Sequence, residues 1–192
     1  MAYRHVALQL AATIRHDGHG GVTDDLDTVE GLALWLEQNA DLLADNVIAA
    51  DSVRVRVVEV RRATRALFAR AVRPAEPASG DTDSRLDPRI ALKQLNAASG
   101  AVLWTYQLDW NDDGPQVRSV TPVIDPETRL VAALARATIE FLAGDRRESL
   151  RACPAPRCVR YFVKRHPQQE WCKPSCGNRA RVSRYYQRHH QD

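Results

Sequence analysis

The stretch CPAPRCVRYFVKRHPQQEWCKPSCGNRARVSRYYQR, residues 153–188, holds all four cysteines of this 192-residue chain. They form two close pairs, C-x4-C and C-x3-C, joined by a 13-residue spacer that is long enough for a hairpin. In a reducing compartment, clustered cysteines are more often metal ligands than disulfides. Four thiolates at this spacing can surround one tetrahedral Zn²⁺ with Zn–S distances of about 2.3 Å. The sequence therefore predicts one zinc ion held by Cys153, Cys158, Cys172 and Cys176.

The predicted zinc ion is structural, because four protein ligands leave no open position for water or substrate. His166 is a competing ligand, but it lies in the middle of the spacer beside Pro167. A segment of about 40 residues buries too little apolar surface to offset its chain entropy without such a metal. Its small core is expected to come from Val159, Tyr161, Phe162, Trp171, Val182 and Tyr185.

Charge is unevenly divided along the chain. Residues 151–192 carry ten Lys or Arg and two acids, a formal charge of +8, whereas the first 150 residues carry 17 basic and 22 acidic residues, or −5. Zinc with four thiolates contributes −2, which leaves the C-terminal segment at +6. A basic segment of this kind favours binding to a polyanion. A solvated basic tail is the alternative.

The residues after the second cysteine pair have helical spacing, with Pro174 suited to a first turn. Arg181, Arg184 and Arg188 recur on one face of this helix. The planar fork of arginine suits phosphate oxygens and guanine edges, so the helix is predicted to contact DNA. The expected DNA-binding residues are Arg157, Arg160, Lys164, Arg165, Lys173, Asn178, Arg179, Arg181, Arg184 and Arg188.

The acidic N-terminal part is predicted to be mainly helical. Helices are expected within residues 3–14, 25–43 and 51–72, after the cap-and-proline pair Asp87-Pro88, and after a second such pair, Asp125-Pro126. Residues 53–60 also alternate like a strand, but the uninterrupted ATRALFARAV that follows favours a helix. Residues 73–85 are predicted to form a mobile linker, and residues 101–124 a β-hairpin around the turn pair Asp113-Gly114.

CPAPRC and WCKPSCGNRARVSRYY, together with the order of elements before them, resemble the CGNR zinc-finger family. Its members join this finger to an N-terminal ABATE-type domain and are regarded as stress-induced transcription regulators. LALWLEQNADLL and ALKQLN are similar to the upstream pattern. The resemblance implies an α+β, predominantly helical fold. An ABATE-type domain with a small β-hairpin would span 1–147, and a treble-clef-like four-cysteine zinc finger ending in a basic helix would span 148–192.

The resemblance also implies that Gly177, Asn178 and Arg179 complete the finger's signature. Gly177 is expected to allow close backbone approach beside the metal. Asn178 is expected to bond a loop carbonyl near the thiolates. For Arg179 two roles remain open, a phosphate contact or a bond to the N-terminal domain.

These observations predict a zinc-dependent DNA-binding transcription regulator, whose N-terminal domain senses a signal or dimerises. The alternative is a scaffold protein whose finger docks a protein partner. An enzyme is not expected, because no nucleophile–base pair or open metal site can be named. A homodimer is possible, since one small finger has a small DNA footprint. A cytoplasmic location without a membrane partner is expected, because the chain has neither a long apolar run nor a secretory signal.

Overall fold

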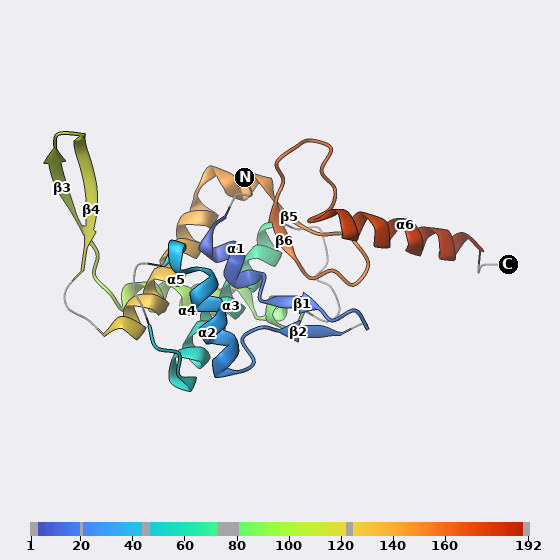
Figure 1. The fold of residues 1–192 in the computed structure, drawn as a ribbon, viewed down its shortest axis with the longest axis horizontal. Helices are drawn as coiled ribbons and strands as arrows, with labels where there is room; N and C mark the ends of the chain where they lie inside the picture. Colours follow the sequence, from blue (N-terminus) through green and yellow to red (C-terminus); the bar gives the residue numbers. More distant parts are fainter. Residues whose placement is uncertain (1–3, 20, 44–46, 73–80, 122–124, 190–192) are drawn as a thin grey trace.

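The computed structural model describes residues 4–19, 21–43, 47–72, 81–121 and 125–189. Helices dominate, and three antiparallel strand pairs accompany them (Figure 1). The helices are α1 Val6–Ala11, α2 Val29–Gln38, α3 Asp51–Ala71, α4 Pro88–Gly100, α5 Pro126–Ala143 and α6 Pro174–His189. The strand pairs are β1 Ile14–His16 with β2 Val22–Asp24, β3 Thr105–Asn111 with β4 Gly114–Val120, and β5 Leu150–Ala152 with β6 Tyr161–Val163. The predicted α+β, predominantly helical class is confirmed.

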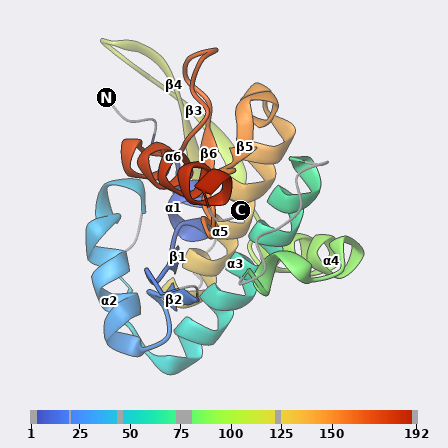
Figure 2. The same cartoon turned by 90° about the vertical axis from the view of Figure 1, so that its right-hand side faces the viewer.

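Helix α3 is the centre of the body. It packs against α1, α4 and α5, and its buried side chains form much of the main core (Figures 1 and 2). Val53, Val57 and Val60 are buried whereas Val55 is exposed, a pattern of helical and not strand period. The β-branched run therefore forms a helix, as predicted, because its three- and four-residue spacing places one stripe against the core.

Local capping explains where the helices begin. Asp87 accepts a hydrogen bond from the backbone N–H of Arg89 (2.7 Å), and Asp125 accepts one from Thr128 (2.8 Å). In each case proline follows the cap in the first turn, where its missing N–H leaves no bond unmade. Both predicted cap-and-proline starts are confirmed.

Two expectations near the N-terminus and the linker differ from the structure. The first helix ends at Ala11, and Ile14 already lies in β1, a three-residue strand too short to be read from periodicity. Residues 73–80 of the expected linker lie outside the described residues. Its remaining part is ordered, because Asp81 and Asp83 are buried as partners of arginines on α3.

The β3–β4 hairpin and α6 project from opposite ends of the molecule's long axis (Figure 1). The hairpin agrees with the prediction, and Leu108 pairs with Val117 at its middle. Gly114 closes the turn with a φ of 100°, a conformation that glycine adopts without steric cost. On α6 only Cys176, Gly177 and Ala180 are buried, so most of this helix stands in solvent.

Candidate metal centre and finger surface

The first cysteine pair lies on the loop between β5 and β6. Cys153 follows β5 and donates its backbone N–H to the carbonyl of Arg160 (2.9 Å), while Cys158 donates to the carbonyl of Ala155 (3.0 Å). The loop turns sharply at Arg157, whose φ of 63° is the single positive value among the non-glycine residues that the structure describes. This tight turn brings two thiols that are five residues apart to one site.

The second pair joins the site from α6. Cys172 lies just before the helix, and Cys176 lies in its first turn. The Sγ atom of Cys172 is 3.8 Å from that of Cys158 and 3.5 Å from that of Cys176, and Cys158 and Cys176 are 3.8 Å apart. All four Sγ atoms lie within 4.8 Å of one another.

These distances suit a zinc ion. A regular tetrahedron with Zn–S bonds of about 2.3 Å has S–S edges of about 3.8 Å. Three of the four thiols are buried and Cys172 is half-buried, so a bound ion would be shielded from water. His166, the competing ligand, is exposed, and its Nδ1 accepts the N–H of Gln168 (3.2 Å). The four cysteines can therefore bind one zinc ion.

Crowding of the thiols governs their ionisation. Hydrogen bonds from Cys153 and Cys172 lower the pKa of Cys158 to about 3. Hydrogen bonds with Cys153 and Cys158 raise the pKa of Cys172 because they favour its protonated form, and burial and the repulsion of a second thiolate act in the same direction. A divalent cation at the centre removes this conflict, since it favours the deprotonated form of every ligand.

The residues after Cys176 pack around the thiols. A Cβ atom on Gly177 would lie 2.9 Å from Cδ1 of Trp171, so the glycine is required by the close approach of this ring. A close approach to the backbone of Gly177 was expected, and the group that approaches it is the ring of Trp171. Arg179 places Nη2 3.5 Å from Sγ of Cys176, where its charge offsets that of a thiolate.

Asn178 does not make the contact expected of it, and Arg179 does not make one of its two expected contacts, the bond to the N-terminal domain. Arg179 binds inside the finger and reaches no N-terminal residue in any contact of the described residues. Asn178 is exposed on α6 and accepts from Arg181, one turn along the same face, and in no described contact does it donate to a loop carbonyl.

The expected DNA contacts fall into two groups. Exposed members are Arg157, Arg165, Lys173, Asn178, Arg181, Arg184 and Arg188. Half-buried members are Arg160, Lys164 and Arg179. The structure thus brings four of the exposed residues, at positions 178, 181, 184 and 188, together on the projecting helix, and leaves the rest on the surrounding loops.

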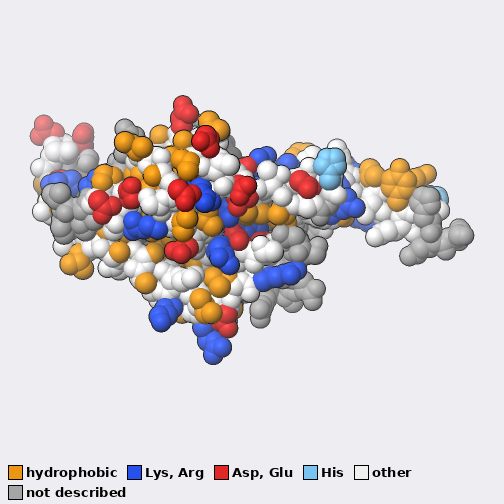
Figure 3. Space-filling view, turned by 90° about the horizontal axis from the view of Figure 1, so that it is seen from below, with side chains coloured by type: hydrophobic (Ala, Val, Ile, Leu, Met, Phe, Trp, Pro, Cys, Tyr) orange, Lys and Arg blue, Asp and Glu red, His pale blue; other side chains and the backbone are white. Residues whose placement is uncertain are grey.

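Val182 and Tyr185 were expected in the finger's core, and this is wrong. They are 53% and 61% exposed, and the neighbouring Tyr186 is 56% exposed. The buried residues of α6 are all in its first turns, beside the cysteine loops, and among the described residues the later turns stand clear of the rest of the protein (Figure 1). Figure 3 shows apolar side chains on the surface of the projecting α6.

The β5–β6 pair is buried on the N-terminal body. Tyr161 and Val163 pack in one cluster with Phe68 of α3 and Phe141 of α5. The Tyr161 ring meets that of Phe68 edge-on, with centroids 5.6 Å apart. The finger's core therefore continues into that of the N-terminal part, which fixes the base of the finger relative to α3.

A buried ion pair strengthens this junction. Arg65 of α3 is fully buried and donates from Nε and Nη2 to the carboxylate of Asp81 (3.0 and 2.6 Å). It also donates to the carbonyl of Ala11 and, at 2.8 Å, to that of Val159, the residue after Cys158. One guanidinium thus links α1, α3, the segment at Asp81 and the cysteine loop.

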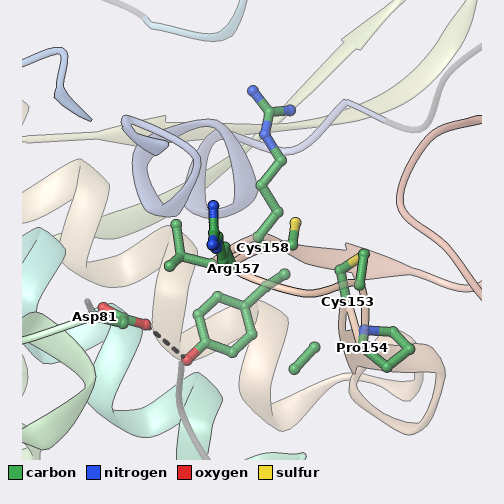
Figure 4. Close-up of a pocket in the computed structure, with 10 residues that line it drawn as sticks. Asp81, Cys153, Pro154, Arg157 and Cys158 are labelled. Atoms are coloured by element: carbon green, nitrogen blue, oxygen red, sulfur yellow. Dashed lines mark hydrogen bonds between the residues drawn. The ribbon is translucent and has the colours of Figure 1, made fainter. Parts of the chain in front are cut away.

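Tyr161 completes this cluster and is one of the residues that line a cavity of about 220 Å³ beside the cysteine loop, with Asp81, Cys153 and Cys158 (Figure 4). Its hydroxyl donates to Asp81 (3.4 Å), and its ring lies 5.2 Å from the Arg65 guanidinium. Burial, and then the nearby Asp81 carboxylate, raise the pKa of Tyr161.

Sequence reasoning missed the residues of this junction. Arg61 and Arg65 fall on the same helical stripe as the apolar residues of α3, and both are buried. Arg61 binds Asp24 and Asp83. The sequence did contain a signal for this junction: two arginines lie on the apolar stripe of α3, and two aspartates follow in the next segment.

Two family models match the chain. A model named ABATE, described as "Putative stress-induced transcription regulator", matches residues 4–145. A CGNR zinc-finger model matches residues 149–189. Neither describes an enzyme. A comparison with curated proteins gives no match. Within the described part of the chain, no helix has the length and apolar character needed to cross a membrane.

Proposed function

Because the chain belongs to the ABATE family and ends in a CGNR zinc finger, we propose that it is a zinc-dependent transcription regulator that binds DNA through α6. The proposed zinc ligands are Cys153, Cys158, Cys172 and Cys176. The proposed division places an N-terminal sensing or dimerisation domain at 1–147 and the finger at 148–192. A cytoplasmic, non-catalytic role accords with this proposal.

The projection of α6 is the observation that carries the proposal. A helix of 16 residues is about 24 Å long, and its diameter suits the DNA major groove, which is about 12 Å wide. Arg181, Arg184 and Arg188 are exposed on one face and free of acidic partners in any described contact. Such a face can meet phosphates and base edges without first breaking an ion pair.

The base of α6 orients these arginines. The guanidinium of Arg184 lies 5.8 Å from the centre of the Trp171 ring, and Arg181 is braced by Asn178. Trp171 in turn packs on Gly177, beside the cysteines. Bound zinc would fix the two loops from which α6 departs. Without the metal, α6 is expected to lose its fixed orientation first and its helical structure only later.

Selection from a random DNA pool tests the proposal. Zinc-loaded protein at about 0.15 M salt is expected to enrich a motif. The Arg181/Arg184/Arg188 triple alanine variant is expected to lose it, and the slope of log K against log salt should fall by about 3. The matched control removes the same charge elsewhere through Arg62, Arg70 and Arg89, all exposed, and should bind as the wild type does. Equal binding by both triple variants would refute the proposal.

A protein-docking finger is the second candidate. Exposed Val182, Tyr185 and Tyr186 on α6 favour it, because an apolar strip on a projecting helix also suits a groove on a protein. Weak DNA retention that is equal for the wild type and the arginine variant, with no enriched motif, would select this function.

A further inference from the structure

The β3–β4 hairpin has one apolar face that, apart from the contact of Arg136 with Tyr106, no residue of the described chain covers. Tyr106, Leu108 and Trp110 alternate along β3 and so lie on one face. Leu108 faces Val117 across the pair, and Trp110 faces Pro115. The exposed fractions are 66% for Tyr106, 64% for Leu108, 74% for Trp110 and 70% for Val117.

The opposite face of the hairpin is polar. Arg118 donates to the carboxylate of Asp109 (2.7 Å) and to the side-chain oxygen of Gln107 (2.9 Å). An antiparallel sheet with one polar and one apolar face normally has the apolar face packed. The residue pattern therefore fits a hairpin that is covered on one side.

The body holds only the base of the hairpin. Arg136 of α5 donates to the hydroxyl of Tyr106, and its guanidinium lies 5.0 Å from the Trp104 ring centre and 5.5 Å from that of Tyr106. Beyond this clamp the strands extend away from the helices (Figure 1). An isolated two-stranded hairpin is marginally stable in water, so an additional surface is needed to stabilise the outer part.

We propose that this surface is the same face of a second copy of the chain. The strands carry no charged side chain on this face at Tyr106, Leu108, Trp110, Pro115 or Val117. The nearest cation is Arg136 at Tyr106, and a contact centred on Leu108 keeps the two copies' Arg136 residues at opposite ends. Along β3 the face presents the aromatic Tyr106, then the aliphatic Leu108, then the aromatic Trp110. A two-fold axis at Leu108 therefore sets Trp110 of one copy against Tyr106 of the other, as a self-complementary interface requires.

The available area suffices for a modest dimer. Fully buried aromatic side chains cover about 150–250 Å² each, and Tyr106 and Trp110 are about two-thirds to three-quarters exposed. With the smaller Leu108 and Val117, the face offers at most about 500 Å² per copy. The total of about 1,000 Å² reaches the lower limit of a specific interface. A dissociation constant in the micromolar range is expected.

The dimer has a consequence that rests on the proposed DNA binding. The hairpin and α6 stand at opposite ends of the long axis (Figure 1). Association through the hairpins therefore leaves both α6 helices free, and places them at the far ends of the dimer. Such a dimer would bridge two separated DNA sites, whereas adjacent half-sites would not be occupied by one dimer.

Sedimentation equilibrium of the zinc-loaded full chain, without DNA, tests the dimer independently of DNA binding. The wild type is expected to dimerise in the micromolar range, and Leu108→Asp to weaken association at least 100-fold by placing a carboxylate in the interface. Gln107→Asp adds the same charge to the exposed polar face, opposite Arg118, and should dimerise as the wild type does. Trp110→Ala, which introduces no charge, should weaken association about tenfold or more.

A wild type that is monomeric at about 100 µM would overturn the proposal. So would equal association of Leu108→Asp and Gln107→Asp, because the dimer would then use another surface or the face would serve another partner. If the dimer forms through the hairpin but DNA selection enriches no motif, the proposed DNA-binding function is refuted and the dimer proposal stands.

Discussion

Replacing Arg65 with methionine is expected to destabilise the whole protein, because this residue joins α3 to the cysteine loop. The substitution leaves the carboxylate of Asp81, which is 2% exposed, buried without its cation. It also removes the donors to the carbonyls of Ala11 and Val159. Breaking a buried ion pair on one side typically costs about 3–5 kcal/mol. A cost of about 4 kcal/mol is a large part of the about 5–15 kcal/mol that stabilises most domains.

Urea unfolding of the zinc-loaded protein, followed by far-ultraviolet circular dichroism, measures this cost. With a slope of about 2 kcal/mol/M, the unfolding midpoint should fall by about 2 M. The matched control is Arg62→Met on the same helix. The Arg62 side chain is 53% exposed and lies 3.7 Å from Asp83, so its loss should cost under about 0.5 kcal/mol.

A second substitution separates charge burial from lost packing. Asp81→Asn in the Arg65→Met background removes the unpaired charge and keeps an acceptor for the N–H of Ser84. About 2 kcal/mol of stability should return. A loss below about 1 kcal/mol for Arg65→Met, or no recovery in the double variant, would refute the view that this pair joins the finger to the body.

Three further predictions concern the finger and α1. Gly177→Ala should weaken zinc binding about tenfold in a chelator competition, because its Cβ would collide with Trp171; Gly100→Ala, where a Cβ meets nothing within 4 Å, should leave affinity unchanged. Cys172→Ser should abolish the one-to-one zinc content found by metal analysis, and retained stoichiometric zinc would contradict the four-thiolate site. Burial lowers the pKa of His5, whose Nδ1 accepts the N–H of Ala7, so its folded-state pKa lies below the unfolded value. The stability that His5 contributes is therefore fully present above about pH 6.5 and is lost as the pH falls below that value. In urea titrations at pH 7 and pH 5, His5→Asn should lose less unfolding free energy between the two pH values than the wild type does. An equal loss in both proteins would contradict this prediction.

Local patterns predicted the features that depend on neighbours in sequence. The cap-and-proline pairs at Asp87 and Asp125 predicted two helix starts, since a cap bonds residues two or three positions away. The spacing of valines in α3 predicted a helix, and the turn pair at Gly114 predicted a hairpin. The cysteine spacing predicted the metal cluster, because each pair sits on one tight turn.

The same patterns failed where distant segments meet. Val182 and Tyr185 were expected to be buried, but apolar character says only that burial is favourable and not that a surface is within reach. The hairpin at 105–120 was expected, yet its uncovered face was not, for the same reason. Asp81 was assigned to a mobile linker, because the composition of that segment was read without Arg65, the arginine on the apolar stripe of α3 that pairs with it from 16 residues earlier.

The sequence by itself determined the helical class, the four-cysteine site, the basic character of the last 42 residues and the family resemblance, all of which rest on residue type and short spacing. Only the tertiary structure decided that the finger shares a core with α3, that Arg65 reaches the carbonyl of Val159 across 94 residues, and that α6 and the hairpin project from opposite ends. The physical reason is that packing and buried ion pairs depend on which surfaces the whole chain brings together, and that arrangement is encoded in no single segment.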